Sequence, residues 1–129
     1  MRFAALLSVP LIVIGAQPAV SQTPAVIAVQ LANFSFTPKS IVLDHGQSYV
    51  LRLANVADGG HDFTAPEFFA ASAIAAADRP LVTEGEVEVP PGQVREIHLT
   101  APGAAGSYHL KCSHSFHKMF GMSGSIIVR

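Results

Sequence analysis

Apolar and polar residues alternate along much of the chain with a period of two, which is typical of half-buried β-strands. The clearest run is residues 48–54, in which Tyr49, Leu51 and Leu53 alternate with a serine, a valine and an arginine. Similar short runs between turn residues predict further strands, at 25–38, 40–43, 81–89, 94–101, 106–112 and 124–129. Several short strands at this spacing predict an all-β sandwich.

One segment, residues 66–78 (PEFFAASAIAAAD), breaks the alternation. It is rich in alanine and opens with Pro66 and Glu67. A proline at the first helical position and an acidic residue in the first turn favour a helix. Its apolar residues are expected to form one face against a sheet: Phe68, Phe69, Ala73, Ile74 and Ala77. We therefore expect one short helical insertion in the sandwich.

The N-terminus has the pattern of a secretory signal peptide. Arg2 supplies a positive start, Phe3 to Gly15 is an apolar run, and Ala19 and Ser21 are small residues that suit cleavage after Ser21. The alternative is a retained anchor, but the run is shorter than the roughly 20 residues that span a bilayer. The expected division is a signal peptide at 1–21 and one domain at 22–129, located in the periplasm without stable membrane insertion after cleavage.

The charge balance argues against a nucleic-acid partner and indicates no other class of partner. The chain has 8 basic and 9 acidic residues. Removal of the leader takes away one arginine, which leaves a net charge near −2. A basic footprint for nucleic acid is missing from the sequence, so no nucleic-acid partner is expected. The remaining length suits one core and a monomer.

The chain contains a single cysteine, Cys112. It can form no intramolecular disulfide, although an exported protein meets conditions that permit one. A lone thiol in such a protein indicates an intermolecular bridge, a reactive group or a thiolate held by a metal. The remaining alternative is an inert, buried cysteine that packs as a small apolar residue.

The surroundings of this cysteine favour a metal. Alternation along 106–112 places Cys112 on the same side as Tyr108 and Leu110, pointing into the sandwich at a strand end. The loop that follows, SHSFHKMFGM, contains two histidines and two methionines. Two imidazoles, a thiolate and a weak axial thioether form the ligand set of blue copper centres. A second histidine from another loop is needed, and His61 in GGHDF follows a predicted strand and a glycine-rich turn.

The chain resembles the cupredoxin family in three stretches: GSYHLKCS, GMSGSIIV and GGHDF. The resemblance covers essentially the whole mature chain and implies a Greek-key β-sandwich that holds one type 1 copper. The ligands that it implies are His61, Cys112, His117 and Met122. The spacing from Cys112 through His117 to Met122 resembles that of the rusticyanins, and its first part is longer than the cysteine-to-histidine loop of the plastocyanins.

Two loop residues remain outside this ligand set. His114 follows Cys112 by only two residues, which leaves its ring little room to reach the same metal, and Met119 lies outside the Gly-Met-x-Gly context. Together they enrich the copper end in soft and borderline ligands, so a second, labile copper near His114 is a further hypothesis. The other histidines are expected at the surface: His45, His98 and His109.

The residues beside the ligands depart from the family at one position. Asp62 follows His61, where many cupredoxins carry an asparagine that ties the two ligand loops together by hydrogen bonds. A carboxylate there alters the surroundings that orient ligands and tune the potential. Ser113 resembles the family's hydroxyl residue after the cysteine and is expected to bond to the opposite loop.

The resemblance implies a carrier of single electrons between redox partners, such as a cytochrome or a copper enzyme. Phe116, Met119 and Phe120 form either an apolar docking patch or part of the core. The alternative function is copper trafficking, buffering or tolerance on the same fold, with a copper-trafficking partner, which the additional His and Met residues favour. A structural module without metal is the third hypothesis.

Enzymatic activity is not expected. The binuclear copper centre of cytochrome oxidase subunit II resembles this loop but needs a second cysteine, and the sequence has one. The trinuclear cluster of multicopper oxidases needs His-x-His pairs, and none occurs in the sequence.

Overall fold

The computed structural model describes residues 9–18, 23–114, 116 and 120–129. The strands within these residues are β1 (Ala25–Ala32), β2 (Ser35–Thr37), β3 (Ser40–Leu43), β4 (Ser48–Asn55), β5 (His61–Thr64), β6 (Ala73–Ile74), β7 (Glu86–Val89), β8 (Val94–Thr100), β9 (Gly106–Lys111) and β10 (Ser123–Val128). Helix α1 (Pro66–Ala71) and the 3₁₀ helix η1 (Arg79–Leu81) lie between β5 and β7.

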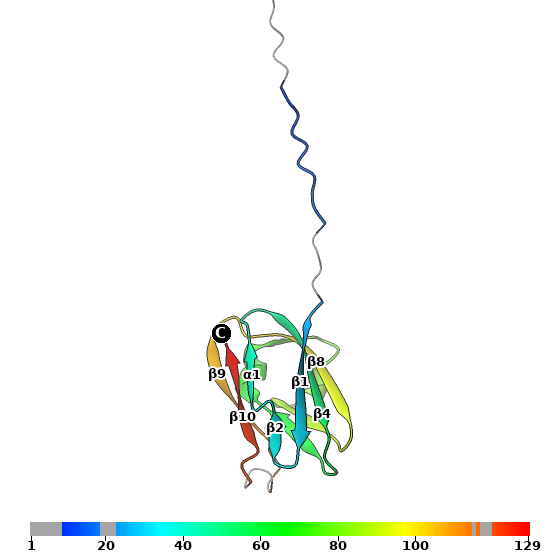
Figure 1. Cartoon of the computed structure of the whole chain (residues 1–129), viewed down its shortest axis with the longest axis vertical. Coiled ribbons are helices and arrows are strands. Elements are labelled where there is room, and N and C mark those ends of the chain that lie inside the picture. The colour runs from blue at the N-terminus through cyan, green and yellow to red at the C-terminus, as the bar shows by residue number, and fades with distance from the viewer. Residues whose placement is uncertain (1–8, 19–22, 115, 117–119) are drawn as a thin grey trace, which may run out of the picture.

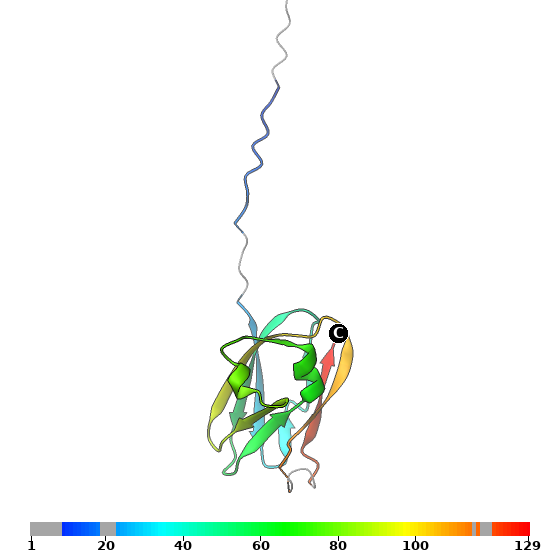
Figure 2. The same ribbon diagram turned by 180° about the vertical axis from the view of Figure 1, so that it is seen from behind.

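The strands form two sheets that pack face to face (Figures 1 and 2). In the described part of the chain, one sheet has the order β2-β1-β4-β8-β6 and the other the order β3-β10-β9-β5-β7. β1 pairs with β4 and β3 pairs with β10 in parallel, and the other pairs are antiparallel. The predicted all-β sandwich with one short helical insertion is confirmed.

The core lies between the sheets and follows the period of two. In β4 the predicted positions Tyr49, Leu51 and Leu53 are buried, while Ser48 and Arg52 are exposed. Phe63 of β5 lies in the middle of the core and contacts aromatic rings from both sides, with ring centroids 6.0 Å from Phe36 and 5.9 Å from Phe69. Each such side chain contributes about 1.5–3 kcal/mol on burial, so this apolar layer holds the two sheets together.

Two predicted elements differ from the structure. The single strand expected at 25–38 is divided, because the chain reverses at Asn33 and Phe34, where Phe34 has a φ of 66°. The helix expected over 66–78 ends at Ala71. Ala73 and Ile74 pair instead with the edge of β8, because the strand edge satisfies their backbone groups. Phe68 and Phe69 are buried as expected.

The N-terminal segment stands apart from the sandwich. Residues 9–18 are exposed, have no regular secondary structure and extend away from the sheets (Figure 1). The expected cleavage point after Ser21 lies outside the described residues. Within the described ranges, the structure contains no helix with the length and apolar character needed to cross a membrane.

Gly124 allows β9, β10 and the chain before β3 to lie close together, next to the loop between Cys112 and Met122. It pairs with Leu110 of β9, and the next residue donates its backbone N–H to the carbonyl of Lys39 at 3.0 Å. A Cβ at Gly124 would collide with that carbonyl and lie 3.3 Å from Leu110 Cδ2. The glycine is therefore required by the close approach of the chain before β3.

We predict that Gly124→Ala destabilises the metal-free protein by about 1–3 kcal/mol, because a backbone carbonyl rather than a flexible side chain must move. Chemical unfolding measures this difference. Gly103→Ala is the matched control, since a Cβ there meets open space, and its unfolding free energy should change little. Equal effects of the two substitutions would contradict the packing argument.

Asp78 fastens the segment after α1 to the edge of β8. Its Oδ2 accepts hydrogen bonds from the backbone N–H and the ring Nδ1 of His98, each at 2.8 Å. These bonds, the backbone one first, hold the pKa of the Asp78 carboxyl below its usual value. His98 is exposed, as predicted from the sequence, but it is paired with this carboxylate.

We predict that Asp78→Asn lowers stability by about 1 kcal/mol at neutral pH, since it removes the charge that strengthens both hydrogen bonds. The folded-state pKa of Asp78 is lower than its unfolded-state pKa of about 3.8. The charged carboxylate therefore stabilises the fold above the unfolded-state pKa, and this contribution is lost as the pH falls through the folded-state pKa. Thermal unfolding between neutral and strongly acidic pH should therefore show the two proteins converging on acidification. A constant difference would contradict this assignment.

Candidate metal centre

Asn55 shapes the loop that delivers the first predicted ligand. Its side-chain amide donates to the carbonyls of Gly59 and Val89 at 2.8 and 2.9 Å, and its Oδ1 accepts from the amide of Ala57 at 2.9 Å. These bonds fold residues 55–60 into a compact turn between the two sheets. His61, the first residue of β5, is completely buried as a result.

Two further predicted ligands within the described residues flank one loop. Cys112 follows β9 and Met122 precedes β10, and both side chains are buried. The backbone N–H of Cys112 donates to the carbonyl of Met122 at 3.1 Å, so the loop between them closes at its base. The predicted inward direction of Cys112 is confirmed. His117 and Met119, which belong to this loop, lie outside the described residues.

His61 and Cys112 meet at the end of the sandwich. Their Nδ1 and Sγ atoms are 4.0 Å apart. Metal bonds of about 2.0 Å to imidazole and about 2.3 Å to thiolate can together span this distance. On the far side of the ring, Nε2 lies 3.3 Å from Oδ1 of Asn33. A proton donated there leaves Nδ1 as the lone-pair atom facing the thiol, which is the arrangement a metal-binding histidine requires.

The environment of Cys112 keeps its thiol neutral without metal. Burial raises the pKa of this thiol, and the backbone N–H groups of Asp62 and His114 lower it to a smaller extent. The Asp62 amide lies 3.5 Å from Sγ. A metal that binds here would replace the thiol proton, and the same two amides would then face a thiolate.

Asp62 joins the two ligand segments. Its Oδ1 accepts from the backbone N–H of Ser113 at 2.8 Å and from the Thr64 hydroxyl at 2.7 Å. Its Oδ2 accepts from the Ser113 hydroxyl. The hydroxyl of Ser113 therefore reaches the opposite loop, as predicted from the sequence, and its partner is the carboxylate that stands where many cupredoxins have asparagine.

Further carboxylates and a histidine surround Asp62. Nε2 of His114 lies 3.2 Å from both carboxylate oxygens of Glu88 and 3.6 Å from Asp62 Oδ2. The Ser113 hydroxyl is also within 3.3 Å of Glu86. Burial and the charge of Asp62 raise the pKa of Glu86 above its usual value. His114 thus lies beside carboxylate oxygens as well as within 4.8 Å of the Cys112 sulfur.

Aromatic side chains near this end of the sandwich are exposed. Phe116 and Phe120 have exposed fractions of 73% and 62%, so both lie at the surface rather than in the core. The ring of Phe34, in the turn between β1 and β2, stacks on Phe120 with centroids 4.6 Å apart. We call these three rings the aromatic patch.

The remaining histidines lie at the surface, as expected. His45 is exposed, and its Nδ1 lies 2.9 Å from the carbonyl of Arg129. His109 is exposed on β9, on the face opposite Leu110. Neither lies in the group formed by His61 and Cys112.

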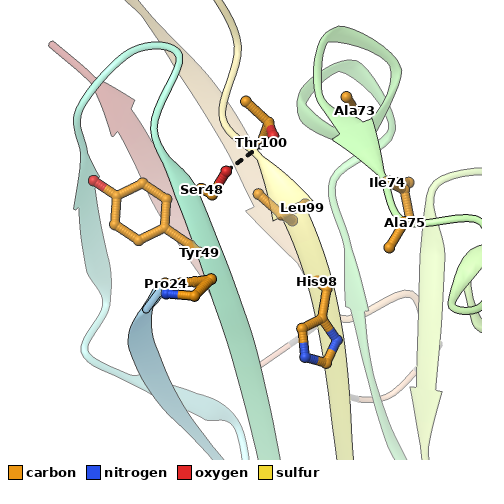
Figure 3. A pocket seen from close by; sticks show the side chains of 9 residues that line it. All are labelled: Pro24, Ser48, Tyr49, Ala73, Ile74, Ala75, His98, Leu99 and Thr100. Atoms are coloured by element: carbon orange, nitrogen blue, oxygen red, sulfur yellow. Dashed lines mark hydrogen bonds between the residues drawn. The ribbon is translucent and has the colours of Figure 1, made fainter. Parts of the chain in front are cut away.

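A shallow hollow of about 360 Å³ lies elsewhere on the molecule (Figure 3). It is lined by the first residues of β4, the last residues of β8 and strand β6, and the Ser48 and Thr100 hydroxyls are 3.3 Å apart beside it. Ser48 and Asn55 are the opposite ends of β4, so the hollow is remote from the ligand loops. It contains none of the predicted ligands.

Four residues around the site are not predicted from the sequence: Asn33, Asn55, Glu86 and Glu88. Asn33 and Asn55 lie in or beside turns, where asparagine is common for local reasons, so no sequence signal separates their long-range contacts from ordinary turn roles. In the sequence, the alternating glutamates of β7 indicate a solvent-exposed strand face. Their register opposite Asp62 and Thr64 places them beside the ligands.

The comparisons with known proteins agree with this fold. The family model of the cupredoxin-like domain matches residues 4–128. A comparison with curated proteins gave no match.

Several solved structures share the fold at low sequence identity. Auracyanin from the photosynthetic bacterium Roseiflexus castenholzii superposes with a TM-score of 0.62 at 18% identity, covering 84% of this chain and 99% of that chain. Auracyanin A, a blue copper protein of Chloroflexus aurantiacus, superposes with a TM-score of 0.54 at 16% identity, covering 83% of this chain and 100% of that chain. The multicopper oxidase McoA of Aquifex aeolicus has a TM-score of 0.63 at 14% identity, with 88% of this chain covering 31% of that chain. With the family model matched over nearly its whole length, the chain belongs to the cupredoxin-like domain family.

Proposed function

We propose that the chain is a type 1 copper protein that carries single electrons between redox partners. The observation that supports this proposal is the pair His61 and Cys112, buried together with a nitrogen-to-sulfur distance of 4.0 Å. Met122, buried at the base of the same loop, supplies the thioether of the expected set. We include His117 as the fourth ligand on the basis of its place in the sequence motif.

The residues of the chain prepare this site for copper. Asn33 orients the His61 ring, and burial of His61, Cys112 and Met122 excludes water from the ligands. The amides of Asp62 and His114 donate toward the cysteine sulfur. Copper, when bound, supplies the one-electron redox chemistry. Because His61, Cys112 and Met122 are buried in the sandwich, we expect these three side chains to move little between the two oxidation states.

We further propose that the aromatic patch is the docking face for a redox partner such as a cytochrome or a copper enzyme. Phe116 and Phe120 are exposed and belong to the ligand loop, and large exposed apolar side chains gathered at one place favour transient protein contacts. We also propose that residues 1–21 form a cleaved signal peptide, that residues 22–129 form the mature domain, and that this domain works as a monomer in the periplasm.

Copper trafficking, buffering or tolerance is the second candidate function. His114 lies close to Cys112 with Asp62 as a common neighbour, and such an additional ligand favours copper transfer or a second, labile copper. A carrier should retain copper against a chelator and exchange electrons rapidly with a cytochrome. A trafficking protein should release copper to the chelator and exchange electrons slowly.

We predict that the metal-free domain 22–129 binds one equivalent of Cu(II) and develops an intense visible absorption from thiolate-to-copper charge transfer. Cys112→Ala should abolish the band, because it removes the sulfur. Met122→Leu should keep the band and raise the reduction potential, since the axial thioether tunes the potential without supplying the thiolate. Optical titration and paramagnetic resonance give these results. The proposal fails if the unmodified domain shows no such band at stoichiometric copper.

We predict that Asn33→Ala weakens copper binding about 10–100-fold, the usual effect of removing the partner that orients a ligand histidine. Asn33→Asp should bind copper close to normally, because its carboxylate accepts the same hydrogen bond from Nε2. Competition with a chromogenic chelator measures both affinities. If both substitutions leave the affinity unchanged, Asn33 does not orient His61.

A further inference from the structure

The side chain of Asp62 is completely buried beside the proposed copper ligands. It accepts three hydrogen bonds, from the Thr64 hydroxyl and from the backbone N–H and the hydroxyl of Ser113. Three hydrogen bonds from donor groups therefore surround its two oxygens, which is the hydrogen-bond geometry of a carboxylate.

This carboxylate is close to the Cys112 sulfur and, within the described residues, is paired with no lysine or arginine. A carboxylate oxygen of Asp62 lies within 4.8 Å of Cys112 Sγ, and within the same distance of carboxylate oxygens of Glu86 and Glu88. Among the ion pairs of the described residues, none joins these three carboxylates to a lysine or an arginine; the cationic partner within 4.0 Å is His114, if it is protonated.

We propose that the charge of Asp62, reinforced by Glu86 and Glu88, stabilises the oxidised form of the centre and so lowers its reduction potential. This inference rests on the proposed copper-binding function and specifies how the same site is tuned. The charge of Asp62, rather than its hydrogen bonds, lowers the potential, because an asparagine at this position would also accept a hydrogen bond from the backbone N–H of Ser113.

The direction of the effect follows from the charges of the two oxidation states. Cu(II) with one thiolate and two neutral imidazoles carries one net positive charge, and the product of one-electron reduction, Cu(I) with the same ligands, carries none. The electron comes from a one-electron donor, such as the redox partner. A nearby negative charge therefore attracts the oxidised centre more strongly than the reduced one. Burial strengthens this effect, because the low dielectric of the interior screens the charge less than water does.

The test compares the copper-loaded domain with Asp62→Asn, which keeps the size and one acceptor oxygen of the side chain and removes its charge. At a fixed applied potential, spectroelectrochemistry should show the ratio of reduced to oxidised centre rising about tenfold or more. For a one-electron couple, tenfold corresponds to 59 mV. The charge-transfer band should keep its intensity, which shows that the ligands remain in place.

Glu96→Gln is the matched control. This substitution also removes one carboxylate charge, but Glu96 lies on β8 in the other sheet and pairs with Arg52 at 2.7 Å. The ratio of reduced to oxidised centre in this variant should therefore change by less than twofold. A change of less than threefold in Asp62→Asn, or a change in the opposite direction, overturns the inference while the band of the unmodified domain still supports the proposed function. Failure of the unmodified domain to form the band overturns both.

A second variant covers the case in which Asp62→Asn does not fold. The double substitution Glu86→Gln with Glu88→Gln removes two charges from the exposed side of the same cluster and leaves the hydrogen bonds of Asp62 to Ser113 and Thr64 in place. Its ratio of reduced to oxidised centre should rise at least threefold, and the rise should diminish at high salt, since partly exposed charges are screened. An unchanged ratio in the double variant overturns the inference.

Discussion

The hydrogen bonds between Asp62 and Ser113 hold the candidate metal centre together, because they join segments that are 51 positions apart in the sequence. His61 precedes one partner and Cys112 precedes the other. Once these bonds form, the imidazole and the thiol lie side by side at the end of the sandwich. The Asp62 side chain that makes the contact is itself buried, so the connection that orders the proposed ligands also places an acidic side chain next to them.

The sandwich makes this arrangement rigid. Phe63, two residues after His61, packs between the ring of Phe36 in β2 and the ring of Phe69 in α1. Gly124 lets β10 lie close to β9 and to the chain before β3. The buried side chains of His61, Cys112 and Met122 therefore lie at the ends of strands that belong to one packed frame. Such a frame suits electron transfer, in which the ligands should move little between oxidation states, and it leaves the exposed part of the ligand loop available for a partner.

Much of the fold was predictable because strand formation follows a local pattern. The alternation around Tyr49 and Leu51, and that around Val87 and Val89, correctly assigned the buried faces of β4 and β7. The helix after Pro66 was predicted too long, because alanine-rich sequence favours a helix while the free edge of β8 offered Ala73 and Ile74 a pairing that the local pattern cannot show. The turn at Asn33 was missed for a similar reason, since Phe34 gives no local indication of a left-handed backbone.

Sequence alone was enough to predict the family and the sandwich, and it also gives the proposed ligand types, because strand periodicity and the Cys and Gly-Met motifs are local features. The surroundings of the proposed ligands, by contrast, come from the packing of the two sheets. The tertiary structure placed Asn33 behind the His61 ring, gave Ser113 a carboxylate partner, and put Glu86 and Glu88 beside Asp62 through the register of β5 and β7. These neighbours come from distant parts of the chain, and a contact between distant residues depends on how the sheets pack rather than on the residues next to them.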